Sequence, residues 1–396
     1  MWLQAMLALF FSAQLIHQCN FVQAYTVGTT TRKRLGSNSF IRKQERGKLR
    51  DVSSSNELKE LASTFISRKR GSNNYYKAWK QWSCLALDSI RYDLSKNLPY
   101  PADRAKFENL FFRLGIAADV GQMPSFSDPG ARSGYALEFF SRARNLADLY
   151  FDALNPSFIF PKDWVNSMME TPMHAGNEPY HIVSLGGGPG FDFVSAALVS
   201  SFSATTLEKE PAVIKATIFD YEEGWSDLVE AMGASTRNIL QQQESTCKWG
   251  GKCDITRPLN HPRNQACLEL VGSTQLWTCQ YCFAENSNLL RESNCIFFRD
   301  LFENAKDGAL FVFTETNPRI WPDLCHLMEE HCPYMQIGFN KKGREMLLRK
   351  SVCSNRTKPL MSEKDRKMVE KFDYLSKHHQ QKIDAGWHRQ KQKTRC

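Results

Sequence analysis

The sequence predicts an alternating α/β fold in the middle of the chain, on three observations. The short apolar segment Ile182–Leu185 ends in a glycine cluster at 186–190, and an apolar run typical of a helix begins at Phe191. Further strand-like segments alternate with helical segments downstream, which is the pattern of a mostly parallel sheet. Amphipathic helical segments precede the glycine cluster. We therefore expect an α/β sheet domain that follows a helical region.

Charge is unevenly distributed along the 396 residues, a length that allows two or three domains. The formal net charge is +9, of which residues 25–75 carry +8 and residues 353–396 carry +7, so that residues 76–352 carry −6. Because the basic excess lies in the terminal segments, the net charge does not by itself indicate a nucleic-acid-binding core.

Residues 1–24 have the pattern of a secretory-type signal peptide. The apolar stretch 5–16 is too short to cross a bilayer but suits a signal sequence, and Val22-Gln23-Ala24 offers a cleavage site. No Lys or Arg precedes the apolar stretch, so a buried N-terminal helix is the alternative. No membrane span is expected in the mature protein.

Residues 25–74 are rich in Ser, Thr, Arg and Lys and poor in acidic residues, as transit peptides are. With Tyr25 directly after the cleavage site, the two segments together resemble the bipartite plastid presequence of algae with complex plastids. That resemblance implies import into a plastid, and the secretory pathway is the alternative.

A helical region is predicted over residues 75–170, before the glycine cluster. Three apolar clusters at helical spacing define it: Tyr76–Ile90, Phe107–Ile116 and Tyr135–Leu154. Arg142 and Arg144 fall in the third cluster, where we expect solvated charges on a helix face, with contact to a substrate phosphate as the alternative.

The glycine cluster does not match two common phosphate-binding motifs. A dinucleotide fingerprint needs a third glycine where Phe191 stands, and no Gly-Lys-Ser/Thr follows as in a P-loop. The missing Cβ atoms still let a ligand approach the backbone, and free N–H groups at the helix start point at it. The spacing Gly186-x-Gly188-x-Gly190 resembles motif I of class I S-adenosylmethionine-dependent methyltransferases. An ordinary strand-to-helix turn is the alternative.

The resemblance implies a Rossmann-like methyltransferase sheet over residues 171–352, closed by an antiparallel hairpin, behind a helical cap at 75–170. It also implies that S-adenosylmethionine is the cofactor. The residues it assigns to the cofactor at this turn are Ser184, Gly186, Gly187, Gly188 and Gly190. Ser184 stands where the family usually has Asp or Glu contacting the methionine amine. This departure leaves open a catalytically silent binding or assembly protein on the same fold.

Two carboxylates follow the next predicted strands. Ala216–Asp220 reads as a strand, and an acidic residue at that point in α/β nucleotide folds accepts hydrogen bonds from ribose hydroxyls. Asp254 follows a short third strand, where the resemblance implies contact with the adenine edge and where capping of the next element is the alternative. Residues 203–211 read as an inserted loop.

The fourth predicted strand and its exit span residues 276–286. Ligands of open α/β sheets lie beyond the carboxyl ends of the strands, so Tyr281, Glu285 and Asn286 are expected to face the reaction centre. Tyr281 is assigned to the cofactor. Glu285 is the candidate base for an acceptor that must lose a proton.

Cys279-x-x-Cys282, with Cys247 and Cys253 nearby, is a conceivable zinc site. The spacings do not form two paired knuckles, so we expect buried thiols and no metal.

The rest of the chain predicts a fifth strand at 308–314, a hairpin at 334–350 and a basic tail at 353–396, in which Ser362 caps a helix. Such a tail adds salt-sensitive affinity for RNA, and a solvated tail is the alternative. The run Asp-Tyr-Glu-Glu-Gly-Trp after the glycine cluster resembles fungal ribosomal RNA uridine methyltransferases. This resemblance ranks RNA first among acceptors, ahead of a small molecule or a protein.

Overall fold

The computed structural model describes residues 73–121, 125–153, 179–207, 211–340, 343–351 and 359–384. The expected signal peptide, the transit segment up to residue 72 and the last twelve residues, 385–396, lie outside the described residues.

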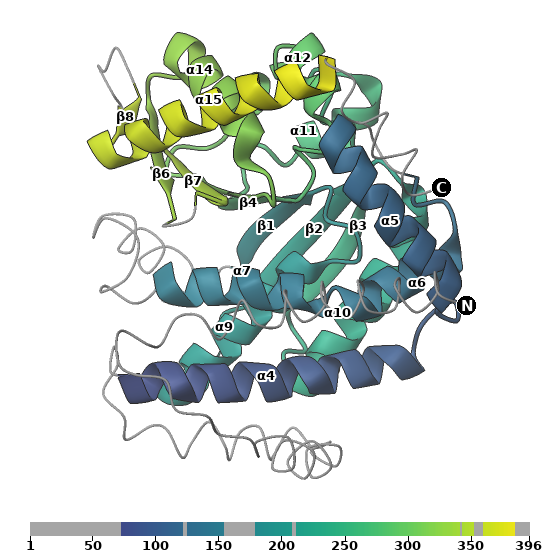
Figure 1. The fold of residues 1–396 in the computed structure, drawn as a ribbon. Helices are drawn as coiled ribbons and strands as arrows, with labels where there is room; N and C mark the ends of the chain where they lie inside the picture. The colour runs from purple at the N-terminus through teal and green to yellow at the C-terminus, as the bar shows by residue number, and fades with distance from the viewer. Residues whose placement is uncertain are drawn as a thin grey trace, which may run out of the picture. The chain divides into compact units, whose positions relative to one another are not determined.

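A mixed sheet forms the centre of the described chain (Figure 1). Its strands are β1 (Tyr180–Leu185), β2 (Ile214–Asp220), β3 (Thr246–Lys252), β4 (Leu276–Gln280), β5 (Leu310–Thr314), β6 (Met335–Phe339), β7 (Glu345–Lys350) and β8 (Leu360–Met361). The strand order is β3-β2-β1-β4-β5-β7-β6-β8. The first five of these strands are parallel, and β7 runs antiparallel to both β5 and β6. The structure therefore confirms a Rossmann-like α/β sheet with a closing antiparallel hairpin, and adds the short β8, which was not predicted.

Both faces of the sheet are buried. Alternate residues of a strand point to opposite faces, so Ile182 packs into one hydrophobic cluster and Val183 into the other. Leu276 and Trp277 divide in the same way one strand further along. Burial on both sides explains why these strands read as continuous apolar runs rather than as an alternating pattern.

One face is covered by α4 (Asn73–Lys96), α7 (Phe140–Ala153), α9 (Phe191–Leu207) and α10 (Ser226–Leu240) (Figure 1). Trp79 of α4 stacks on Phe151 of α7 with ring centroids 4.5 Å apart, and Phe202 of α9 packs edge-on at 5.3 Å from Trp79. The indole Nε1 of Trp79 donates to Asp148 at 2.8 Å. The N-terminal helices and the sheet thus share one hydrophobic core.

Two further N-terminal helices are α5 (Arg104–Val120) and α6 (Pro129–Glu138). The predicted continuous helix 135–154 is divided at Phe139, whose ψ of 20° ends α6 before α7 begins. The prediction of a loop at 203–211 was wrong for its first part, because α9 continues to Leu207; residues 208–210 lie outside the described residues. Hydroxyl groups on this part of α9 bond to the backbone, as Thr205 does to the Ser201 carbonyl at 2.8 Å, so the polar residues remain helical.

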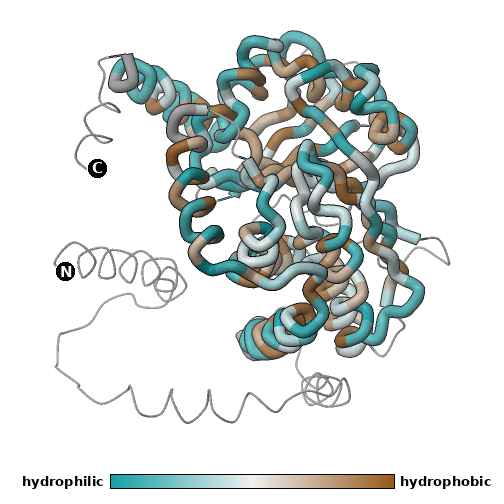
Figure 2. Tube along the Cα trace, turned by 90° about the vertical axis from the view of Figure 1, so that its right-hand side faces the viewer, coloured by the Kyte–Doolittle hydropathy of each residue, from teal (hydrophilic) through white to brown (hydrophobic). Residues whose placement is uncertain are grey.

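The other face is covered by α11 (Gln265–Leu268), α12 (Ser287–Glu292), α13 (Ile296–Asn304), α14 (Trp321–His331) and α15 (Glu363–Asp384). Ser362 caps α15 as predicted, since its Oγ accepts from the Asp365 N–H at 3.1 Å. Figure 2 shows that α15 is largely hydrophilic while the interior strands are hydrophobic. Within the described residues, no helix combines the length and the apolar character needed to cross a bilayer.

Candidate functional site

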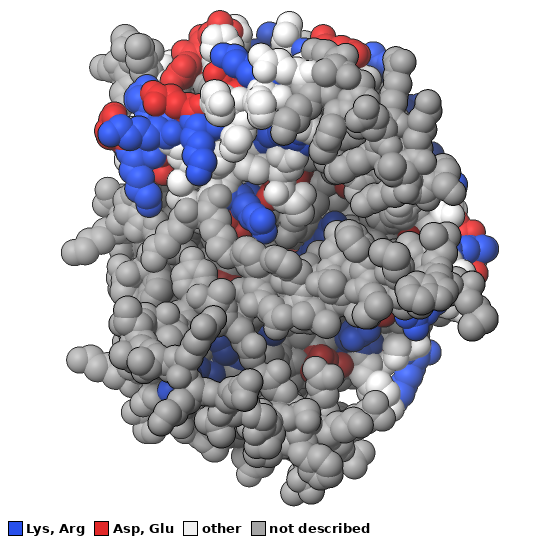
Figure 3. All heavy atoms as spheres, in the orientation of Figure 1, with Lys and Arg blue, Asp and Glu red and all other residues white. Residues whose placement is uncertain are grey.

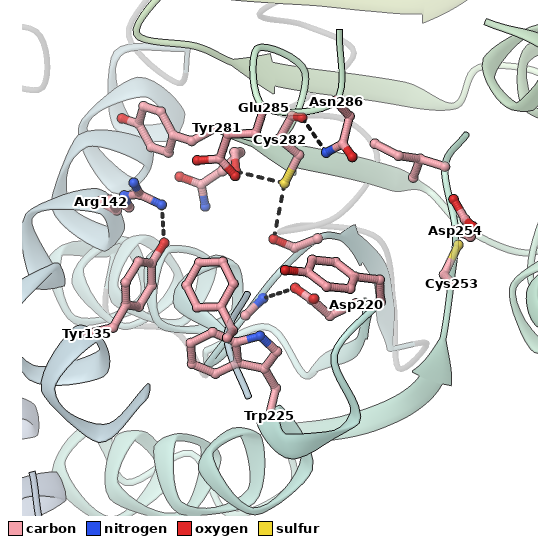
Figure 4. A pocket seen from close by; sticks show the side chains of 16 residues that line it. Tyr135, Arg142, Asp220, Trp225, Cys253, Asp254, Tyr281, Cys282, Glu285 and Asn286 are labelled. Carbon is pink, nitrogen blue, oxygen red and sulfur yellow. Dashed lines mark hydrogen bonds between the residues drawn. The ribbon is translucent and has the colours of Figure 1, made fainter. Parts of the chain in front are cut away.

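A cleft opens beyond the carboxyl ends of β1, β2, β3 and β4 (Figure 4). The space between its walls is about 590 Å³, which includes open solvent at the mouth. Its walls come from the glycine turn, the segments after β2, β3 and β4, and helices α6 and α7. Seven residues singled out from the sequence line it: Gly186, Gly188, Asp220, Asp254, Tyr281, Glu285 and Asn286.

The turn after β1 requires glycine for two separate reasons. Gly186 and Gly188 have φ values of +61° and +50°, in the left-handed region that favours glycine. A Cβ at Gly186 would also lie only 2.2 Å from the Sγ of Cys282. The Gly187 N–H donates to the Phe219 carbonyl at 3.0 Å, which holds the turn against the end of β2.

Asp220 faces this turn. Its Oδ2 accepts from the Gly188 N–H at 3.1 Å and its Oδ1 accepts from the Glu222 N–H at 3.1 Å. Figure 4 shows the carboxylate turned toward the turn, next to Trp225. Burial raises the pKa of Asp220 to about 6. A carboxylate has about four lone-pair sites, so Asp220 keeps acceptor capacity for a ligand hydroxyl.

Three residues assigned to the cofactor do not line the cleft: Ser184, Gly187 and Gly190. Ser184 is fully buried and its Oγ donates to Oδ2 of Asp192 at 2.7 Å. A Cβ at Gly187 would lie 2.4 Å from the Ser184 Oγ, and one at Gly190 would lie 3.2 Å from the Cys247 Sγ. These residues shape the core beneath the turn.

The segment after β4 is held in a strained conformation. Tyr281 has a φ of +60°, which is uncommon for a residue with a side chain. Its N–H donates to the Thr314 carbonyl at 2.8 Å, and the Cys282 Sγ contacts the Gly186 carbonyl at 3.4 Å. Both contacts tie the segment to neighbouring strands.

Glu315, directly after β5, anchors the same segment. Its Oε1 accepts from the Ala284 N–H at 3.1 Å, and burial raises its pKa to about 7. The sequence analysis missed this residue, although the rule that identified Asp220 applies to it: both are acidic residues at the carboxyl end of a buried strand.

Arg142 and Glu285 both line the cleft, and their charges interact. Burial raises the pKa of Glu285 to about 8, and the nearby charge of Arg142 opposes this rise. The Arg142 guanidinium lies over the Phe139 and Tyr281 rings, at 4.5 Å and 4.2 Å from their centroids. It also donates to the Tyr135 hydroxyl (Figure 4).

The expectation that Arg142 is a solvated charge was therefore wrong. Tyr135 lies in α6, Phe139 is the break between the two helices and Arg142 lies in α7, so the three residues meet at a helix junction. There the Arg142 guanidinium lies over the Tyr135 ring, and both residues line the cleft. Because this junction depends on the helix break, the spacing in the sequence did not indicate that Arg142 belongs to the site.

Asp254 lines the cleft and also caps the turn after β3. Its Oδ1 accepts from the Thr256 N–H at 3.0 Å and from the Thr256 hydroxyl at 2.6 Å. The Oδ1 atom of Asp254 therefore has the capping role that was the alternative prediction. Nearby, the indole N–H of Trp225 is buried and has no hydrogen-bond partner among the described residues.

The thiols near the site are not arranged around a metal. Cys253 and Cys282 line the cleft, while Cys279 is buried within β4. Burial raises the pKa of Cys279, and a hydrogen bond with Cys279 together with burial raises that of Cys282. Among the described residues, no group of three or more His, Cys, Asp or Glu side chains is placed to hold a metal ion.

Comparison with known proteins gave structural matches only. No family model and no curated protein matches the sequence. Among solved structures, an S-adenosylmethionine-dependent methyltransferase from Methanosarcina mazei is 11% identical, with 45% of this chain and 95% of that chain covered and a TM-score of 0.30. An S-adenosylmethionine-dependent O-methyltransferase from Thermotoga maritima is 14% identical, with 53% and 72% covered and a TM-score of 0.30.

A putative class I S-adenosylmethionine-dependent methyltransferase from Listeria monocytogenes is 10% identical, with 75% of this chain and 99% of that chain covered and a TM-score of 0.30. At such identities and scores the matches add nothing to the strand order and strand directions, on which the fold assignment rests.

Proposed function

We propose that this protein is an S-adenosylmethionine-dependent methyltransferase. The observation that carries the proposal is the pairing of the Asp220 carboxylate with the Gly188 N–H at 3.1 Å, at the mouth of a glycine turn that opens into a cleft. A carboxylate that can accept hydrogen bonds from hydroxyl groups therefore lies next to a glycine turn whose backbone a ligand can approach closely. A nucleoside that carries a polar chain needs both features, one for its ribose and one for the chain.

The donors and acceptors of the cleft fit such a ligand. Asp220 would accept from the ribose hydroxyls, and Asp254 and Tyr281 would flank the nucleoside. Arg142 supplies the positive charge that a carboxylate at the other end of the ligand would need.

Methyl transfer needs few catalytic side chains, because the bound sulfonium would supply an electrophilic methyl group. The residues of the cleft hold the acceptor in line and exclude water. Glu285 is placed to take a proton from an acceptor that must lose one, and its pKa of about 8 is suited to a base that works near neutral pH.

We propose RNA as the first acceptor class to test, followed by small molecules and proteins. The support is the charge of residues 353–396, which is +7 in total. Helix α15 carries only +1 of it, and Figure 3 shows Lys and Arg mixed with Asp and Glu where this helix lies. The proposed RNA contact therefore depends on the basic residues at 356–358 and 389–395, all of which lie outside the described residues.

Calorimetric titration with S-adenosylmethionine tests the cofactor. The wild-type protein is expected to bind, and Gly188→Arg to abolish binding, because its side chain fills the turn. Gly272→Arg is the matched control, since Gly272 is exposed, has an ordinary φ and has no atom within 4 Å of its would-be Cβ. Asp220→Asn keeps the shape of the site and should weaken binding. Absence of heat with the wild type would end the proposal.

Catalysis needs a separate test, because the replacement of an acidic residue by Ser184 favours a second candidate, a silent cofactor-binding protein on this fold. The purified protein is incubated with radiolabelled S-adenosylmethionine and extracts of RNA, protein or metabolites. Label incorporated into one class identifies the acceptor. Cofactor binding without incorporation into any of the three supports the silent protein.

A further inference from the structure

A carboxylate is buried beneath the glycine turn, outside the cleft. Asp192 lies in the first turn of α9 and is 1% exposed. Burial raises its pKa, and interactions with the side chains of Thr278, Ser184 and Gln280 oppose that rise. The Ser184 hydroxyl donates to Oδ2 at 2.7 Å, and the Gln280 Nε2 donates to Oδ1 at 2.9 Å.

The carboxylate fixes the orientation of the Gln280 amide. An ionised carboxylate only accepts hydrogen bonds, so Gln280 must present its NH₂ group to Asp192. The amide oxygen of Gln280 then points away from Asp192. Gln280 is the last residue of β4 and lines the cleft, although its residue exposure is only 7%. The cleft therefore has a hydrogen-bond acceptor whose direction is set by a group in the core.

A fixed acceptor backed by a buried negative charge selects a cationic N–H donor. The hydrogen bond from Gln280 to Asp192 polarises the amide and makes its oxygen a stronger acceptor. The negative charge of Asp192 also attracts a cation that is bound at the amide oxygen of Gln280. A hydroxyl or carbonyl group of a ligand would gain less from this arrangement than an ammonium group would.

We propose that the Gln280 amide oxygen binds the ammonium group in the amino-acid part of the ligand, with Asp192 and Ser184 as its positioning residues. This inference rests on the proposed function, because S-adenosylmethionine supplies the ammonium group. In this arrangement Ser184 does not contact the ligand: its hydroxyl positions the Asp192 carboxylate, which in turn orients the Gln280 amide.

Three nucleosides separate the parts of the ligand: S-adenosylhomocysteine, its desamino analogue and 5′-methylthioadenosine, which lacks the amino-acid part. For the wild-type protein, loss of the amino group should weaken binding roughly 10- to 100-fold, the effect of one hydrogen bond to a charged group. Gln280→Leu should weaken binding of S-adenosylhomocysteine by a similar factor. It should leave the desamino analogue and 5′-methylthioadenosine unchanged.

Asp192→Asn tests the positioning step. An asparagine can present its NH₂ group to Gln280 and turn the Gln280 NH₂ group into the cleft, so this variant should show the same selective loss. Gln242→Leu is the matched control, because Gln242 is a buried glutamine that bonds to the Ala197 carbonyl at 3.0 Å and lies outside the cleft. It should lower the midpoint of thermal unfolding and leave the ratio of the three affinities unchanged.

The outcomes separate the two proposals. If the wild type binds S-adenosylhomocysteine and Gln280→Leu weakens all three nucleosides equally or none of them, the role of Gln280 is overturned and the proposed function stands. If the wild type binds none of the three nucleosides, the proposed function itself fails. A selective loss in both Gln280→Leu and Asp192→Asn supports the inference.

Discussion

Replacement of Gly186 by alanine should destabilise the protein for two reasons that can be measured separately. The φ of +61° costs an alanine about 1–2 kcal/mol. The added Cβ would lie 2.2 Å from the Cys282 Sγ, so the segment after β4 must move, and overpacking of this kind costs about 1–3 kcal/mol. We expect a total loss of about 2–5 kcal/mol in the free energy of unfolding.

Two other glycines isolate these contributions in urea-induced unfolding of the ligand-free protein. Gly308 has a φ of +81° and no atom within 4 Å of its would-be Cβ, so Gly308→Ala should cost only the backbone strain. Gly272 has neither constraint, and Gly272→Ala should change stability by no more than about 0.5 kcal/mol. Cys282→Ala added to Gly186→Ala should recover the overpacking part and leave the strain. The reasoning is refuted if Gly186→Ala costs no more than Gly308→Ala.

Three further predictions concern the cleft and the core. Arg142→Met should weaken binding of S-adenosylhomocysteine at least about tenfold, because a charged hydrogen bond to the ligand carboxylate is lost, and should leave binding of the decarboxylated analogue unchanged. Arg144→Met, on the same helix, should change neither affinity. Equal effects of the two variants in calorimetry would contradict the role given to Arg142. The pKa of Glu285 is raised from its ordinary 4.5 to about 8, so the folded state favours the protonated form of this carboxyl. The contribution of Glu285 to the free energy of unfolding is therefore lost as pH rises from about 4.5 to 8. Glu285→Gln should therefore flatten the pH dependence of the thermal midpoint, and parallel curves for variant and wild type would count against it. Trp79→Ala should lower the free energy of unfolding in urea by about 3–5 kcal/mol. Tyr92→Ala, at an exposed site on the same helix, should lower it by no more than about 0.5 kcal/mol. A small loss for Trp79→Ala would show that α4 is not part of the core.

The sheet could be predicted from the sequence because its signals are local. The run Ile182–Leu185 ends in glycines, Asp220 closes the next strand, and both patterns lie within a few consecutive residues. The two-residue β8 has no comparable pattern, since its pairing with β6 depends on where α15 packs. The end of α9 was missed because its serines and threonines read as a loop, whereas their hydroxyls bond within the helix.

The site was harder to predict because its groups meet across long stretches of chain. Gln280 and Asp192 are separated by 88 residues, and nothing near either position indicates the other. Arg142 lies on a helix before the sheet, so its place in the cleft follows from packing of α7 on α9 rather than from a motif. The glycines could be located from their spacing, but which of them line the cleft depends on the geometry of the turn: Gly186 and Gly188 do, and Gly187 and Gly190 do not.

The stacking of Trp79 on Phe151 limits how far the N-terminus can be trimmed during maturation. A cleavage before Trp79 leaves this aromatic pair intact, whereas a cleavage after it removes the partner of a buried ring and exposes the apolar surface of α9. We predict that any proteolytic processing of the chain that preserves the fold leaves Trp79 and the rest of α4 after it in place.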